Sequence, residues 1–248
     1  EVFNTLENGS YCVLSASGLA SIHLALISVL KSGDHLLISD NVYGPVRNLG
    51  DTLLKKLNIE ITYFSPLKDD LATLIRPNTR LLYLESPGSL LMEMLDLPAL
   101  AATAKAHDVL VAVDNTWGTS LYEPLTLGAD MSIIAGTKYV GGHSDLLLGA
   151  IVTDNPEVAH QLQQMQYAVG NSVSADDVWL ALRGVKTLAI RLQTHARHAQ
   201  AVSRFLSEHP KVSRIYDPAW PLDPGHAIWQ RDCTGANGLL SVSLRCSP

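Results

Sequence analysis

The feature that most restricts how this chain can fold is a regular alternation of short apolar runs with amphipathic stretches, from residue 17 to about residue 153. Runs of strand length, several of them apolar on both faces, occur at 35–39, 60–64, 81–84, 109–113, 131–135 and 146–152. Strands apolar on both faces are buried on both sides. The intervening stretches at 19–30, 47–57 and 97–107 predict helices. We therefore expect an α/β fold with a mostly parallel sheet between helical layers.

The pattern changes after about residue 174. Residues 176–206 predict largely helical structure that only Gly184 interrupts, and the tail after Pro210 is rich in Pro, Gly and Trp. Residues 239–244 predict one more strand. We expect a large domain over residues 1–186, followed over 187–248 by a connector helix and the beginning of a smaller, truncated C-terminal α/β domain.

Composition narrows the class of partner. The net charge is −6, from 18 basic and 24 acidic residues, and the basic residues are dispersed along the chain. A nucleic-acid-binding face needs clustered Lys and Arg, so we expect no nucleic-acid partner. No apolar run approaches the roughly 18 residues of a membrane span, so no membrane partner is expected either. Cys12, Cys233 and Cys246 show no paired spacing, which favours a reducing cytoplasmic compartment.

Ligands of such sheets bind outside the carboxyl ends of the strands, so the residues that follow each strand are the candidates for a binding site. The segment SASGLA at residues 15–20 leads directly into a predicted helix. The first amides of a helix lack internal acceptors and favour an anion, so the amides of Gly18 and Leu19 are candidates for binding a phosphate. The alternative is an ordinary helix capped by a serine.

Two further strands are followed by chemically useful side chains. Asp114 ends the run at 109–113, where a carboxylate can pair with a protonated pyridine nitrogen, although Asp and Asn also favour plain turns. Lys138 follows the run at 131–135, next to Thr137. A lysine whose stem lies in an apolar site can act as nucleophile and base, whereas a lone lysine in a loop is more often only exposed.

Tyr43 stands at a predicted strand-to-helix junction, where its ring could stack on a flat cofactor or cover the edge of the core. The consecutive residues His143, Ser144 and Asp145 look like a hydrolase relay, but such a relay is defined by spatial geometry and adjacent residues cannot form it. The His195 and His198 pair has no third ligand spaced to complete a metal site, and none is expected.

Together these candidates match one kind of ligand. They comprise amides for a phosphate, an aromatic ring, a carboxylate and an amine, each predicted at the carboxyl end of a strand in one sheet. A phosphorylated aromatic aldehyde requires these parts.

The segment MSIIAGTKYVGGHSD at 131–145 resembles the cofactor-lysine motif of the Cys/Met-metabolism pyridoxal-phosphate enzymes. The resemblance extends over essentially the whole chain, through RGVKTL at 183–188 to GHAIWQRD at 225–232. ESPGS at 85–89 and DNTW at 114–117 are most similar to the bacterial cystathionine β-lyase branch. This resemblance implies pyridoxal 5′-phosphate as cofactor and the type I pyridoxal-phosphate transferase fold.

The resemblance also implies roles for individual residues. Lys138 would hold the cofactor as a Schiff base, Asp114 would pair with its pyridine nitrogen, and Tyr43 would stack on its ring and serve as an acid or base. Gly18, Leu19 and Thr137 would bind the phosphate. The implied substrate-binding residues are Ser89 and Trp117.

Two positions depart from the family pattern. Ala135 stands where much of the family has a serine that binds the phosphate, and Ser89 stands where much of it has Asn. The family's N-terminal Tyr and Arg and its C-terminal carboxylate-binding Arg have no counterpart in this sequence, so its N-terminal arm is expected to be missing.

The activity implied is β-elimination of cystathionine to homocysteine, pyruvate and ammonia in methionine biosynthesis. The alternatives are a γ-lyase or a cysteine desulfhydrase of the same family, or a non-catalytic regulatory protein that binds the cofactor on this fold. A nucleotide-binding α/β domain is disfavoured because its glycine pattern is absent. By resemblance we expect a homo-oligomer arranged as a dimer of dimers.

Overall fold

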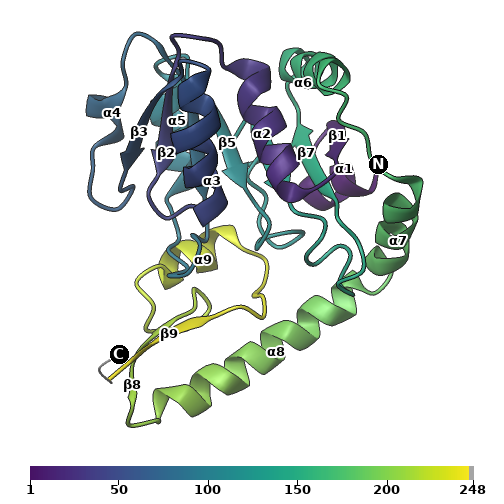
Figure 1. Cartoon of the computed structure of the whole chain (residues 1–248). Coiled ribbons are helices and arrows are strands. Elements are labelled where there is room, and N and C mark those ends of the chain that lie inside the picture. The colour runs from purple at the N-terminus through teal and green to yellow at the C-terminus, as the bar shows by residue number, and fades with distance from the viewer. Residues whose placement is uncertain (246–248) are drawn as a thin grey trace.

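A computed structural model describes residues 1–245 and shows one large sheet, flanked by helices, and a smaller two-stranded sheet (Figure 1). The large sheet has seven strands in the order β1-β7-β6-β5-β4-β2-β3. Its strands are β1 (Tyr11–Ser15), β2 (His35–Ser39), β3 (Glu60–Phe64), β4 (Thr79–Glu85), β5 (Leu110–Asp114), β6 (Met131–Ile134) and β7 (Gly149–Thr153). The small sheet pairs β8 (Val212–Tyr216) with β9 (Ser241–Leu244). Cys246 lies outside the described residues.

The direction of the strands confirms the predicted mostly parallel sheet. All neighbouring pairs from β3 to β6 are parallel, while β7 runs antiparallel to both β6 and β1. Because two reversals restore the direction, β1 runs the same way as β6. The carboxyl ends of β1, β2, β4, β5 and β6 therefore lie along one edge of the sheet.

Helices cover both faces of this sheet. They are α1 (Val2–Glu7), α2 (Gly18–Val29), α3 (Gly44–Leu49), α4 (Leu71–Leu74), α5 (Leu97–Lys105), α6 (Pro156–Ala168), α7 (Ala175–Val185), α8 (Leu188–Ser207) and α9 (His226–Asp232). α2, α3 and α6 pack on one face, and α4 and α5 on the other. Alternate residues of a strand enter opposite cores: Leu36 and Ile38 face α2, whereas Leu37 faces α5. No helix within residues 1–245 is both long and apolar enough to cross a bilayer.

Several predicted boundaries were wrong. The helix expected at 47–57 begins earlier, at Gly44, because Pro45 suits its first turn, and it continues as a π-helical turn, η1 (Gly50–Leu54). A side chain at Gly50 would approach the Tyr63 hydroxyl to 2.8 Å, so glycine lets this turn pack closely against β3. The strand expected at 146–152 is Gly149–Thr153. The first helix and strand, α1 and β1, were not predicted.

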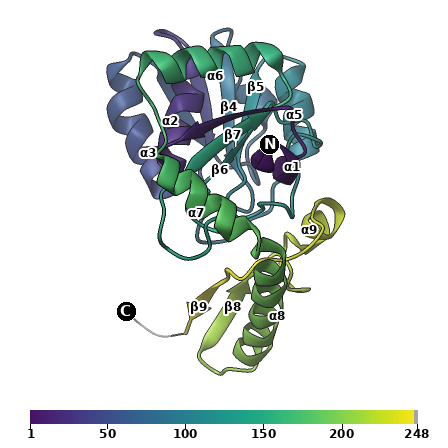
Figure 2. The ribbon, with the colours of Figure 1, turned by 90° about the vertical axis from the view of Figure 1, so that its right-hand side faces the viewer.

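The long helical stretch is divided, but not at Gly184. That residue lies inside α7, and the break comes at Lys186 and Thr187, before α8. α8 leads away from the large sheet to the β8–β9 pair, and α9 lies between this pair and the large sheet (Figures 1 and 2). α9 packs on the core beside α5 through Ile228 and Trp229. The domain boundary at 186/187 stays a prediction.

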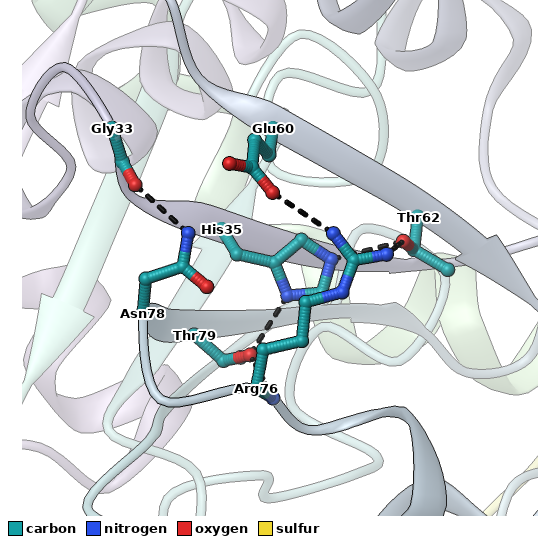
Figure 3. A network of polar contacts seen from close by, with 7 residues as sticks. All are labelled: Gly33, His35, Glu60, Thr62, Arg76, Asn78 and Thr79. Atoms are coloured by element: carbon teal, nitrogen blue, oxygen red, sulfur yellow. Dashed lines mark hydrogen bonds and ion pairs between the residues drawn. The ribbon is translucent and has the colours of Figure 1, made fainter.

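A polar network ties together the amino ends of β2, β3 and β4, at the edge opposite the candidate site (Figure 3). The ring of His35, the first residue of β2, hydrogen-bonds to the hydroxyls of Thr79 at 2.7 Å and Thr62 at 2.9 Å. Arg76 pairs with Glu60 at 2.9 Å. Burial lowers the pKa of His35, so the ring is neutral and its role is structural.

Candidate cofactor site

The start of α2 presents free backbone donors. Ser17 caps the helix through its hydroxyl, which accepts from the Ala20 amide at 3.1 Å. The amides of Gly18 and Leu19 have no acceptor among the described residues. A side chain on Gly18 would come within 2.6 Å of the Ala135 Cβ, so glycine allows the helix start to approach the end of β6. Two donors at a helix N-terminus therefore lie close to the segment that carries the lysine.

Lys138 lies in the turn that follows β6, and it is exposed. Its own backbone amide donates to the Ala135 carbonyl at 3.0 Å, and its carbonyl accepts from Gly142 at 2.8 Å. The adjacent Thr137 hydroxyl donates to the Leu148 carbonyl at 3.2 Å and accepts from the Leu148 amide at 3.0 Å. Thr137 thus ties this turn to the segment before β7, and its hydroxyl must rotate before it can donate to a phosphate.

The turn that carries Lys138 is also held in place by contacts with α7 and α8. Arg191 donates to the Tyr139 carbonyl at 2.7 Å and to the Gly184 carbonyl at 2.9 Å. A side chain at Gly184 would collide with the backbone carbonyl of Val140. This close approach explains the glycine that sequence reasoning took for a helix break.

Asp114 is buried as the last residue of β5. Its Oδ1 accepts from the Thr116 amide at 3.0 Å and from the Thr116 hydroxyl at 2.6 Å. Burial raises the pKa of this carboxyl, while the two Thr116 donors act against that rise. The Thr116 hydroxyl in turn accepts from the Ala135 amide at 2.9 Å, which links the ends of β5 and β6. The structure therefore provides a buried carboxyl oriented by fixed donors.

Glu85 is a residue that sequence reasoning missed, although it begins the ESPGS segment. Its Oε2 accepts from the Tyr43 amide at 2.6 Å, and its Oε1 lies 2.6 Å from the Ser89 hydroxyl. In the strand register Glu85 is paired with Asp114. The structure thus places Tyr43 and Ser89 around a carboxyl adjacent to Asp114. The signal that could have identified it is an acidic residue directly after the predicted strand at 81–84, within a family motif.

The predicted ring-stacking and substrate residues differ in exposure. Tyr43 is 49% exposed, as expected for a residue available to a ligand. Trp117 is buried in the turn after β5, and its indole Nε1 has no hydrogen-bond partner among residues 1–245. The Trp117 carbonyl accepts from Asn237 at 2.7 Å, so the C-terminal segment reaches this turn.

The two features dismissed from the sequence have structural roles. Asp145 pairs with Arg183 at 2.6 Å, and His143 bonds to the Gly141 carbonyl at 2.9 Å, so neither contributes to a relay with Ser144. His195 packs edge-on against the ring of Tyr139. Across the part of the chain that the structure describes, no cluster of acidic, His and Cys side chains could hold a metal ion.

The groups at this edge fit pyridoxal phosphate. Free amides at the start of α2 suit the phosphate, the buried Asp114 suits a protonated ring nitrogen, and an accessible Lys138 amine suits the aldehyde. The individual roles of these residues remain predictions.

Comparison with known proteins agrees with this fit. The family model described as "Cys/Met metabolism PLP-dependent enzyme" matches residues 1–248. A cystathionine β-lyase of Bordetella avium is 57% identical, over 100% of this chain and 63% of the relative. A cystathionine β-lyase of Haemophilus influenzae is 40% identical, over 96% of this chain and 61% of the relative. The chain thus spans just over three fifths of the length of these relatives.

A solved structure of cystathionine γ-lyase from Lactobacillus plantarum, complexed with L-serine, superposes with a TM-score of 0.94 at 35% identity. The match covers 98% of this chain and 64% of that one. The family match over the full sequence, the shared fold and the fitting donor set lead to one conclusion. This chain belongs to the Cys/Met metabolism family of enzymes that depend on pyridoxal phosphate as cofactor.

Proposed function

We propose that this chain forms the cofactor-binding part of a carbon–sulfur lyase that cleaves cystathionine by β-elimination, releasing homocysteine, pyruvate and ammonia. The observation that carries the proposal is the meeting of the Asp114, Tyr43, Ser89 and Lys138 segments at one edge of one sheet. The cystathionine β-lyase names of the relatives support the same choice of reaction. Methionine biosynthesis is the corresponding metabolic setting.

In this proposal the cofactor, when bound, withdraws electrons from the substrate α-carbon. The Lys138 amine would hold the cofactor through its aldehyde carbon, and the same amine would take up the α-proton of the substrate. Asp114 carries the negative charge that keeps the ring nitrogen protonated. The amides of Gly18 and Leu19, with the Thr137 hydroxyl, hold the phosphate. Tyr43 stacks on the ring and serves as an acid or base.

We assign the substrate contacts to Ser89 and Trp117. Ser89 is held by Glu85, and Trp117 is held by the C-terminal segment through Asn237. Substrate choice in this fold depends on few residues, and the γ-lyase named for the L. plantarum structure makes a γ-lyase the second candidate. The remaining alternatives are cysteine desulfhydrase activity and a non-catalytic regulatory role.

The proposal includes a homo-oligomer, a dimer of dimers, acting in the cytoplasm on a small sulfur amino acid. The acidic net charge of −6 and dispersed basic residues support a small-molecule substrate over nucleic acid. Cys12 and Cys233 are free thiols, with pKa values that burial raises to about 11 and about 12. Such thiols are unreactive, in keeping with a reducing compartment. We also retain the division at 186/187 into a large domain and the beginning of a smaller one.

Covalent labelling tests the cofactor assignment. The full-length protein should absorb visible light as an imine, and borohydride should fix the cofactor to Lys138 alone. Lys138→Ala should lose both the absorption and the label, while Lys186→Ala, a matched change in the loop between α7 and α8, should keep them. A label on any other lysine contradicts the assignment.

Product analysis tests the reaction. Cystathionine should yield pyruvate and homocysteine in equal amounts with the full-length protein. Release of 2-oxobutyrate and cysteine would identify a γ-lyase instead. A protein that absorbs as an imine but turns over no thioether amino acid would support the regulatory alternative.

A further inference from the structure

The carboxyl of Glu85 is the point where the Tyr43, Ser89 and Asp114 segments meet, and the mechanism above assigns it no chemical role. Glu85 is the last residue of β4 and is paired in register with Asp114, the last residue of β5. Its two oxygens engage the Tyr43 amide and the Ser89 hydroxyl, each at 2.6 Å. Its backbone carbonyl accepts from the Asn41 side chain at 3.2 Å, which also ties it to the segment after β2.

Two carboxyls side by side in a desolvated site do not both ionise readily. Burial, and then the charge of Asp114, raise the pKa of Glu85 to about 8. None of the groups that act on either carboxyl within residues 1–245 is a cation. Tyr83 on β4 also faces the pair, and its phenol stays neutral because burial, and then the neighbouring Asp114 and Glu85 carboxyls, raise its pKa. The pair therefore holds one proton near neutral pH.

The hydrogen bonds indicate which carboxyl holds that proton. Asp114 accepts hydrogen bonds from the Thr116 amide and from the Thr116 hydroxyl. Because the Thr116 oxygen accepts from the Ala135 amide, its hydroxyl hydrogen is directed at Asp114. Glu85 has one obligate donor, the Tyr43 amide, because the Ser89 hydroxyl can either donate or accept. Asp114 is therefore the better site for the negative charge, and a cationic ring nitrogen beside it adds to this preference.

We propose that Glu85 is a positioning residue that carries a proton while Asp114 carries the charge, and that it donates this proton to Ser89. This inference rests on the proposed function, in which Asp114 faces the cofactor. With its oxygen accepting from Glu85, Ser89 keeps its own hydroxyl hydrogen free to donate to the bound substrate. When Glu85 ionises, the Ser89 hydroxyl turns back to donate to it, and a second negative charge stands beside Asp114.

The neutral acid has a close mimic in glutamine, whose carbonyl can accept from Tyr43 while its NH₂ donates to Ser89. Glu85→Ala removes both bonds. In the full-length protein, E85A should lose roughly 5- to 150-fold in cofactor affinity, about 1–3 kcal/mol, because two hydrogen bonds are lost. E85Q should recover most of that loss. Glu208→Gln, an exposed change at the end of α8, controls for removal of one acidic side chain.

The pH profile separates a positioning role from a merely structural one. In the wild-type protein the KM for substrate should rise at alkaline pH, where Glu85 loses its proton. E85Q should not show this alkaline rise, because glutamine cannot ionise. The proposal is overturned if E85Q binds cofactor as poorly as E85A, or if E85Q keeps the rise.

A second readout needs neither cofactor nor turnover. The infrared difference spectrum of full-length apoprotein, wild type minus E85Q, should show the carbonyl band of a protonated carboxylic acid at pH 6 that vanishes by pH 10. Absence of the band at pH 6 overturns the proposal for Glu85. Failure of the proposed function has a different result, namely no attachment of cofactor to Lys138.

Discussion

Single residues at the candidate site act through fixed hydrogen bonds. Thr116 supplies both donors to Asp114 and receives the amide of Ala135, so one threonine orients the acid and joins two strand ends. Ala135, where much of the family has serine, lies within reach of Gly18, and this contact leaves little room at the start of α2. Glycine at position 18 therefore allows close packing between that helix and the end of β6.

Asp114→Asn keeps the shape of the acid and removes its charge. Loss of one member of a buried charge pair costs about 2–5 kcal/mol, so cofactor affinity should fall at least ~30-fold. Equilibrium titration of full-length apoprotein with pyridoxal phosphate measures the cofactor affinity of each variant. Asp130→Asn is the matched control, because Asp130 accepts from the Val111 amide at 2.7 Å near the opposite end of the same strand. Equal loss in both variants would remove Asp114 from the site.

Among the elements, α1 is held to the sheet by one buried acid. The Oε2 of Glu7 accepts from Asn115 at 2.6 Å and from Ser132 at 2.7 Å, so this short helix is fastened beside the carboxyl end of β5. Burial raises the pKa of Glu7 to about 7. Below that pH the folded protein keeps Glu7 neutral.

This raised pKa predicts a loss of stability as the pH rises. Between the ordinary value of 4.5 and about 7, the folded state holds a proton that the unfolded state has released. The contribution of Glu7 should therefore decline across that window, by up to about 3 kcal/mol. Glu7→Gln should weaken this dependence in urea unfolding at pH 5 and pH 8, whereas the exposed Glu157→Gln should follow the wild type. If the free energy of unfolding of E7Q falls between pH 5 and pH 8 as much as that of the wild type, the assignment to Glu7 is contradicted.

For the whole molecule, the C-terminal segment returns to the candidate site from the far end of α8. Asn237 is buried and donates to the Trp117 carbonyl, and the Thr234 amide donates to the Leu121 carbonyl at 2.8 Å. These contacts join residues more than a hundred positions apart. The position of Trp117 thus depends on the docking of the segment around α9.

Asn237→Ala should loosen this docking, because a buried carbonyl left without its donor costs about 1–3 kcal/mol. Amide hydrogen exchange should quicken in residues 226–238, and the KM for substrate should rise. Asp96→Asn weakens only the exposed ion pair with Arg231 and should change exchange little. Unchanged exchange in N237A would show that the segment is held by other contacts.

The sequence by itself determined six of the seven strands of the large sheet, three of the helices between them and the positions of Asp114 and Lys138 relative to strand ends. It could do so because burial on both faces demands apolar runs, and in a parallel sheet ligand-binding residues follow the strands. Only the tertiary structure revealed the reversed β7, the break at Lys186 and the meeting of Tyr43, Ser89 and Asp114 at Glu85. Those features depend on strand register and on contacts between distant residues, and no local pattern of residues specifies either.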